Sequence, residues 1–158
     1  MAAFRLTSPV FEHDEELPFK CTAEGGDVSP PLRWEGVPAE AKELVLICDD
    51  PDAEYGVFTH WVVYGLAPDT EGLPEGLGRD AVIERDDLSL VQGLNEFDEV
   101  GYSGPQPPEE PTSGPHRFFF RLFALDVELD LPPGVTRADL RTAAKDHVVA
   151  QAELVGIA

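Results

Sequence analysis

The 158-residue chain contains 31 Asp and Glu residues against 11 Lys and Arg residues, for a formal net charge of -20. This charge disfavours nucleic acid as a partner, because phosphate contacts need cationic side chains. The N-terminus lacks an apolar run of signal-peptide length, and the longest uncharged run, residues 55–68, is shorter than the roughly 20 residues of a membrane-spanning helix, so we expect a soluble cytoplasmic protein without integral membrane association.

The composition nevertheless favours a folded chain. Hydrophobic residues make up 42% of it, and the acidic residues are dispersed among them, so we expect residues 1–158 to form a single domain. So acidic a surface repels itself in dilute buffer and is screened in molar salt, which favours the cytoplasm of a halophile. Cys21 and Cys48 belong to neither a CxxC pair nor a zinc-ligand spacing, so we expect two buried free thiols.

Four segments have the apolar, β-branched and aromatic composition of strands. In chain order they are "ELVLIC" (43–48), "HWVVYGL" (60–66), "HRFFFRLFAL" (116–125) and "AELVGI" (152–157). The segment "GYSGPQPPEEPTSGP" (101–115) concentrates proline and glycine between two of them, which indicates a loop of defined shape.

One late segment is predicted to be helical. Thr136 can cap it, and Asp139 stands at the third position after the cap. Helical spacing continues through Leu140, Ala144, His147 and Val148. Together these segments predict a mainly β fold with a late helix, either a sandwich or an open barrel.

His116 begins the third predicted strand. Because side chains alternate between the two faces of a strand, His116 is expected to share a face with Phe118 and Phe120, while Arg117 faces away and is assigned to structure.

His60 begins the second predicted strand. The same alternation aligns it with Val62 and Tyr64 and turns Trp61 away, so that Trp61 is also assigned to structure. Either histidine alone would suit a structural role. Two of them, each beside an acid-rich or proline-rich loop, favour a shared pocket.

Six ordered motifs extend this interpretation. They are "SPPLRWEGVP" (29–38), "DPDA" (50–53), "HWVVYGL" (60–66), "GYSGPQPP" (101–108), "GPHRFFFRLFALD" (114–126) and "AELVGI" (152–157). In this order they closely resemble the phosphatidylethanolamine-binding protein (PEBP) family, in its bacterial and archaeal Raf-kinase-inhibitor-like branch. The resemblance covers residues 4–157.

The resemblance implies an antiparallel β-sandwich with a short C-terminal helix and long pocket-forming loops. It also implies a small surface pocket for anions such as phosphate, acetate or a phosphorylated head group, with no cofactor and no catalysis. Carried over by position, the pocket residues are Asp50, Asp52, His60, Gly104, Pro105, Pro107, Pro108, His116 and Phe118. A protein partner, a homodimer and modulation of a kinase or other enzyme through the pocket are further properties that the resemblance suggests.

The expected chemistry of the pocket is hydrogen bonding to an anion. A histidine can donate to a phosphate oxygen, loop N–H groups can add donors, and a carboxylate can orient an imidazole. Two departures from the family pattern point to weaker anion binding or a different small ligand. Glu54 replaces the proline that usually follows "DPDA", and Phe118 replaces a tyrosine and so lacks its hydroxyl group.

Other interpretations of the same residues stay open at this point. His60, His116 and either Asp50 or Asp52 could form a two-histidine, one-carboxylate metal site of a small hydrolase or oxygenase. The sequence contains neither HExxH nor GxSxG. A second alternative is an interaction protein that inhibits a kinase or protease by surface contact, independently of the pocket. The two acids could also serve only as turn-forming residues.

Overall fold

The structure is a computed structural model that describes residues 3–107 and 114–158. Its elements are β1 (Arg5–Thr7), β2 (Glu15–Glu16), the 3-10 helix η1 (Phe19–Cys21), β3 (Leu32–Glu35), β4 (Glu43–Asp50), β5 (Phe58–Leu66), β6 (Gly72–Leu73), β7 (Val82–Arg85), β8 (Leu88–Gln92), β9 (Arg117–Leu125), α1 (Arg137–Ala144) and β10 (Val148–Ile157). The strands form a seven-stranded sheet, in the order β2-β10-β9-β4-β5-β8-β7, and a three-stranded sheet, in the order β1-β3-β6. The predicted β-sandwich is confirmed. Its neighbouring strands are antiparallel except for the two-residue pairing of β2 with β10, which is parallel.

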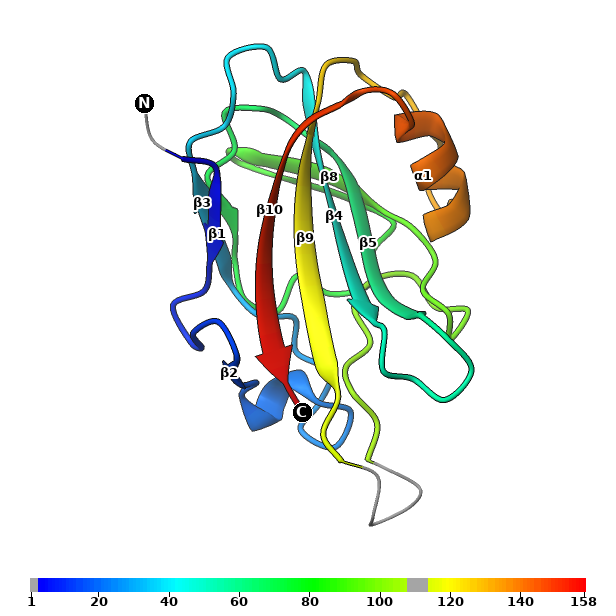
Figure 1. The fold of residues 1–158 in the computed structure, drawn as a ribbon. Helices are drawn as coiled ribbons and strands as arrows, with labels where there is room; N and C mark the ends of the chain where they lie inside the picture. Colours follow the sequence, from blue (N-terminus) through cyan, green and yellow to red (C-terminus); the bar gives the residue numbers. More distant parts are fainter. Residues whose placement is uncertain (1–2, 108–113) are drawn as a thin grey trace.

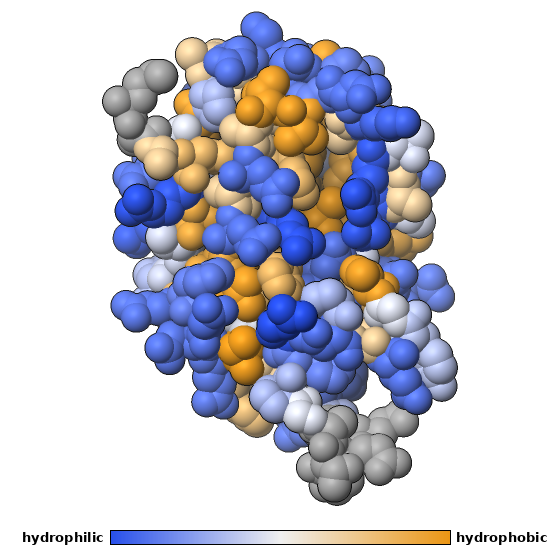
Figure 2. All heavy atoms as spheres, in the orientation of Figure 1, coloured by the Kyte–Doolittle hydropathy of each residue, from blue (hydrophilic) through white to orange (hydrophobic). Residues whose placement is uncertain are grey.

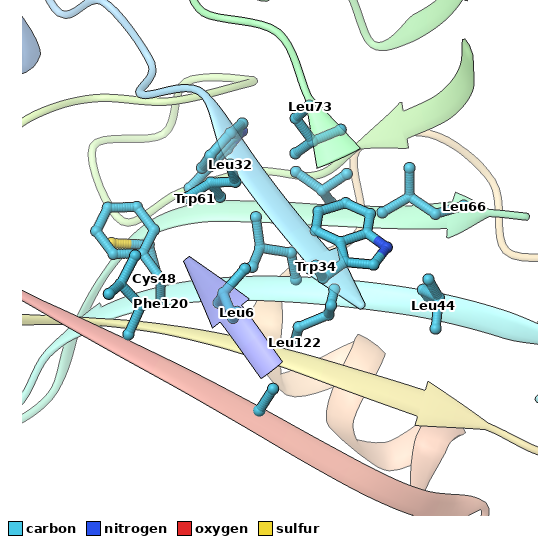
Figure 3. Packing of buried hydrophobic residues seen from close by; sticks show 14 of the residues in the cluster. Leu6, Leu32, Trp34, Leu44, Cys48, Trp61, Leu66, Leu73, Phe120 and Leu122 are labelled. Atoms are coloured by element: carbon cyan, nitrogen blue, oxygen red, sulfur yellow. The ribbon is translucent and has the colours of Figure 1, made fainter. Parts of the chain in front are cut away.

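The main core lies between the two sheets. Leu6, Leu32 and Trp34 of the small sheet pack with Leu44 and Leu122 of the large one, as Figure 3 shows. These side chains come from strands that the alternation rule turns toward each other. The small sheet therefore covers the face of the large sheet that carries Phe118 and Phe120.

The opposite face of the large sheet is covered by α1 at one end (Figure 1). Leu140 and Ala144 of the helix pack on Val45, Val62 and neighbouring apolar residues of the central strands. β4 is buried along its whole length because both of its faces are covered. This explains why the sequence of β4 reads as a continuous apolar run rather than an alternating one.

The predicted strands are present, with shifted ends. β5 begins two residues before His60, and β4 and β10 are longer than predicted. His116 lies just before β9, yet its N–H donates to the Ala158 carbonyl at 2.7 Å and its carbonyl accepts from the Ala158 N–H at 3.0 Å. The ladder between β9 and β10 therefore continues to His116. The short strands β1, β2, β3, β6, β7 and β8 were not predicted.

The helix is shorter than its spacing suggested. The predicted capping box is present, because the Thr136 side chain accepts from the Asp139 N–H while the Asp139 side chain accepts from the Thr136 N–H. The helix ends at Ala144, since Lys145 leaves helical geometry and Asp146 has a φ of 68°. His147 and Val148 thus lie outside it, and the prediction that they continue the helix is wrong.

The surface is largely hydrophilic, with apolar patches between the charged side chains, in the view of Figure 2. Cys21 and Cys48 are buried free thiols, as predicted. No helix within the described residues is long and apolar enough to span a membrane.

Candidate functional site

Asp50 and His116 form the centre of the candidate site. Asp50 ends β4 and His116 precedes β9, and these strands are neighbours in the sheet. Nδ1 of His116 lies 2.6 Å from Oδ2 of Asp50, whose side chain is only 5% exposed, whereas that of His116 is 34% exposed. Because a carboxylate only accepts, Nδ1 donates, and the second ring nitrogen of His116 is left for a ligand.

His60 is held differently, by a backbone carbonyl. Its Nδ1 lies 2.7 Å from the Ser103 carbonyl oxygen, and the Ser103 N–H donates back to the His60 carbonyl at 3.1 Å. A carbonyl oxygen can only accept, so Nδ1 carries the proton. Burial lowers the pKa of His60 below its usual value and favours the neutral ring. Nε2 of His60 is then a lone-pair acceptor.

Phe118 lies between the two histidines. Its ring meets the His60 ring edge-on, with centroids 5.1 Å apart, and stacks on the His116 ring at 6.5 Å. Phe58 and Phe97 close the other sides of His60. Phe118 is 3% exposed, so the residue that replaces the family's tyrosine forms a buried aromatic floor.

A β-bulge sets the direction of His60. Cys48 pairs with Trp61 and Asp49 with Thr59, so His60 is the extra residue of β5. It packs against Phe118 on the side of the inter-sheet core, where Trp61 also lies.

The prediction that His60 shares a face with Val62 and Tyr64 is therefore wrong, because these two residues pack on the side of α1. Both that prediction and the prediction that Trp61 faces away from His60 assumed strict alternation along β5. The bulge interrupts this alternation. Trp61 is nevertheless structural, as assigned, since it is buried and its Nε1 donates to Gln92 Oε1 at 2.8 Å.

Asp52 faces Arg117 rather than the histidines. Its two carboxylate oxygens accept from Nε and one terminal nitrogen of Arg117, each at 2.9 Å, and Oδ2 also accepts the Arg117 N–H at 2.9 Å. Hydrogen bonding from the guanidinium lowers the pKa of Asp52 to about 2. The Asp52 N–H in turn donates to Asp50 Oδ1 at 2.8 Å. Asp52 and Arg117 thus fix the loop that positions Asp50.

The loop after Gly101 forms the wall beside His60. The Gly104 N–H donates to Asp27 Oδ1 at 2.7 Å, and the Pro105 carbonyl accepts from the Ala23 N–H at 2.9 Å. A Cβ at Gly104 would lie 2.1 Å from the Cys21 carbonyl oxygen, so only glycine fits there. Pro105 is buried and Pro107 is exposed. Pro108, also predicted in the pocket, lies outside the described residues.

Two residues that were not predicted hold this wall in place. Arg79 donates to Ser103 Oγ at 3.1 Å and pairs with Asp27, the acceptor of the Gly104 N–H. Neither residue belongs to a motif of the pocket, so nothing in the sequence links them to it. Ser103 itself lies within the "GYSGPQPP" motif, but its role depends on a backbone carbonyl, which residue identity does not reveal.

The described residues contain no group of three or more His, Cys, Asp or Glu side chains arranged to hold a metal ion. A hollow of about 750 Å³ is lined by residues of 53–59, 94–98 and 136–138. A smaller one of about 380 Å³ lies beside β3 and β6. Neither hollow is lined by His60 or His116. The candidate site itself consists of the hydrogen-bonded side chains around Phe118.

Comparison with known proteins identifies the family of this chain. The family model of the phosphatidylethanolamine-binding protein matches residues 7–158. The chain belongs to the phosphatidylethanolamine-binding protein family. A UPF0098 protein of Methanothermobacter thermautotrophicus is 47% identical over 152 residues, which cover 96% of each chain. One of Pyrococcus abyssi is 45% identical over 150 residues, which cover 95% of this chain and 82% of the relative.

Solved structures of PEBP relatives have the same fold. The crystal structure of a PEBP homologue from Chlamydia trachomatis superposes with a TM-score of 0.85 at 40% identity, covering 99% of this chain and 97% of the other. Escherichia coli YbcL, described as a new member of the mammalian PEBP family, gives a TM-score of 0.86 at 29% identity, covering 99% and 98%. The PEBP fold therefore brings Asp50, His60, His116 and Phe118 of this chain together, while Asp52 supports them from the side.

Proposed function

We propose that this PEBP-family chain is a non-catalytic binding protein that takes a small anion, such as phosphate or a phosphorylated head group, at His116 beside Phe118. The observation that carries the proposal is the buried Asp50 carboxylate at Nδ1 of a partly exposed His116. A carboxylate at one ring nitrogen supports an imidazolium that donates to an anion from the other, and such charge-assisted bonds are the strong ones.

Removal of the donor tests this proposal. His116→Ala should weaken phosphate binding roughly ten- to a hundredfold, since it deletes the proposed donor of a charge-assisted hydrogen bond to the anion. Calorimetric titration with phosphate and with phosphoethanolamine, at constant high ionic strength, measures the loss. Circular dichroism confirms that the variant is folded.

His147→Ala is the matched control. His147 also places Nδ1 against a carboxylate, Asp126 Oδ1 at 3.0 Å, but at the opposite end of the β9–β10 pair. This variant should bind phosphate like the parent. Equal binding by all three proteins, or no binding by the parent, contradicts the proposed function.

Three further expectations stay predictions from the sequence. They are the cytoplasm of a halophile as the setting, a homodimer, and modulation of a kinase or other enzyme. For the modulation of an enzyme, the proposed pocket offers only a place where a regulating ligand could bind. Loss of any effect on an enzyme in His116→Ala but not in His147→Ala would separate pocket-dependent from pocket-independent contact.

A further inference from the structure

The larger hollow is lined by neither histidine of the candidate site. It has a volume of about 750 Å³ and lies among three segments of the described chain: residues 53–59 at the connection from β4 to β5, residues 94–98 after β8, and residues 136–138 at the start of α1. Ligand sites commonly have volumes of roughly 300–1,000 Å³. The hollow is therefore large enough to receive part of a partner molecule.

Apolar side chains are exposed in the wall of this hollow. Tyr55 is 96% exposed, more than any other large hydrophobic side chain in the described part of the chain, and Val57 is 47% exposed. Phe58 and Ala138 also line the hollow. Apolar side chains that gather at a hollow within a polar rim are typical of interaction surfaces, where tyrosine is enriched.

The rim of the hollow is mainly acidic. Glu54, Glu96 and Asp98 are exposed residues that line it. Arg137 is the one arginine or lysine among the described lining residues, and its Nε donates to Oδ2 of Asp49 at 3.0 Å. The side chain of Asp49 is only 4% exposed, so this arginine is already paired with a buried acid. The charge around the hollow therefore favours a cationic partner.

Hydrogen bonds hold the three segments together. Oε2 of Glu96 accepts the Thr59 N–H at 2.5 Å, and the Glu96 N–H donates to the Thr59 carbonyl at 3.0 Å. The Thr59 hydroxyl donates to Oδ1 of Asp49 at 2.8 Å, while the other oxygen of this carboxylate accepts from Arg137. The hollow is thus formed before a partner arrives, which lowers the entropy that binding costs.

We infer that this hollow is a docking site for a basic segment of a partner protein. An apolar side chain of that segment contacts Tyr55 and Val57, while lysine or arginine side chains beside it pair with Glu54 and Asp98. A cationic side chain can also lie over the Tyr55 ring. A second copy of this chain is a poorer occupant, because its formal net charge of -20 repels the acidic rim. The inference goes beyond the proposed function and does not depend on anion binding at His116.

A short synthetic peptide of alternating lysine and leucine, carrying a fluorophore, is the probe. Fluorescence anisotropy at constant ionic strength measures its affinity for the unmodified protein. A companion peptide with glycine in place of leucine, and another with glutamate in place of lysine, should each bind about tenfold more weakly or worse, because each lacks one half of the complementarity. No binding of the lysine–leucine peptide overturns the inference.

Paired variants locate the binding of this peptide. Tyr55→Ser should weaken it about fivefold or more, and Glu54→Gln about twofold or more. Phe19→Ser, at an aromatic side chain that is 67% exposed on η1, and Glu84→Gln, at an exposed acid of β7, are the matched controls and should bind like the parent.

Two results of these measurements would contradict the docking site. Equal losses in the hollow variants and in their controls would mean that the peptide is attracted to the acidic surface as a whole. Self-association of the unmodified protein that Tyr55→Ser abolishes, as sedimentation would show, would assign the hollow to a second copy. Tyr55→Ser should bind phosphate like the parent, which keeps the test of the hollow distinct from that of the candidate site.

Discussion

The chain carries the same chemical pair at both ends of the β9–β10 ladder. At one end Nδ1 of His116 meets Asp50 at 2.6 Å, and at the other Nδ1 of His147 meets Asp126 at 3.0 Å. The two histidines are similarly exposed, at 34% and 40%, but Asp50 is 5% exposed and Asp126 is 43% exposed.

The burial of the carboxylate therefore distinguishes the candidate site from the exposed pair at the other end. A buried carboxylate keeps its charge near the imidazole unscreened, whereas an exposed pair is weakened by water and salt. Asp50 is also held by the Asp52 N–H, and His116 stacks on Phe118. Removing these supports one at a time should make the two ends more alike.

The largest effect is expected from the carboxylates. Asp50→Ala leaves the His116 Nδ1 and the Asp52 N–H without their acceptor, and should lower the free energy of unfolding by about 2–3 kcal/mol. Asp126→Ala removes a half-exposed pair and should change it by less than about 0.5 kcal/mol. Urea unfolding at constant high salt measures both. Similar losses in the two variants would refute the distinction between the ends.

A smaller effect should follow from the aromatic floor. Phe118→Tyr adds a hydroxyl group beside both histidines and supplies the donor that the family pattern usually has there. Phosphate affinity should rise about two- to tenfold, the gain of one hydrogen bond from a neutral donor. Phe119→Tyr is the control, because Phe119 lies on the other face of β9 under Arg117 and Arg121. If a folded Phe118→Tyr variant binds no better than the Phe119→Tyr control, the floor has no room for the hydroxyl.

The smallest effect concerns the Asp52–Arg117 pair. The pKa of Asp52 is lowered from 3.8 to about 2, so the pair stabilises the fold above pH 3.8 and loses this contribution as the pH falls through about 2. Arg117→Met should return the pKa of Asp52 toward its usual value, as an NMR titration of the carboxyl carbon would show. Arg121→Met removes an arginine that also stacks on Phe119 but pairs with Glu153, and should leave the pKa of Asp52 unchanged.

The sequence predicted the parts of the fold and the site that depend on local pattern. The long strands were found because their apolar runs reflect burial, and His116 was placed correctly beside Phe118 because β9 alternates without interruption. The face on which His60 lies was predicted wrongly, because the bulge at this residue depends on the pairing of β5 with β4. The proton on its Nδ1 depends on a carbonyl 43 residues away. The shortest strands carry too few residues to show a period.

The position of β9 in the sheet has a consequence for the order of assembly. β9 lies between β4 and β10 in the large sheet. The pairing of β9 with β4 brings His116 to Asp50, which lies 66 residues earlier in the chain. During synthesis β4 and β5 can pair as soon as they emerge. The other edge of β4, which pairs with β9 in the finished sheet, stays unpaired until β9 has been made. An unpaired edge on so apolar a strand is a template for association with other chains. The nascent chain is thus most vulnerable to aggregation between the emergence of β5 and that of β9, and the ligand site is completed only when this interval ends.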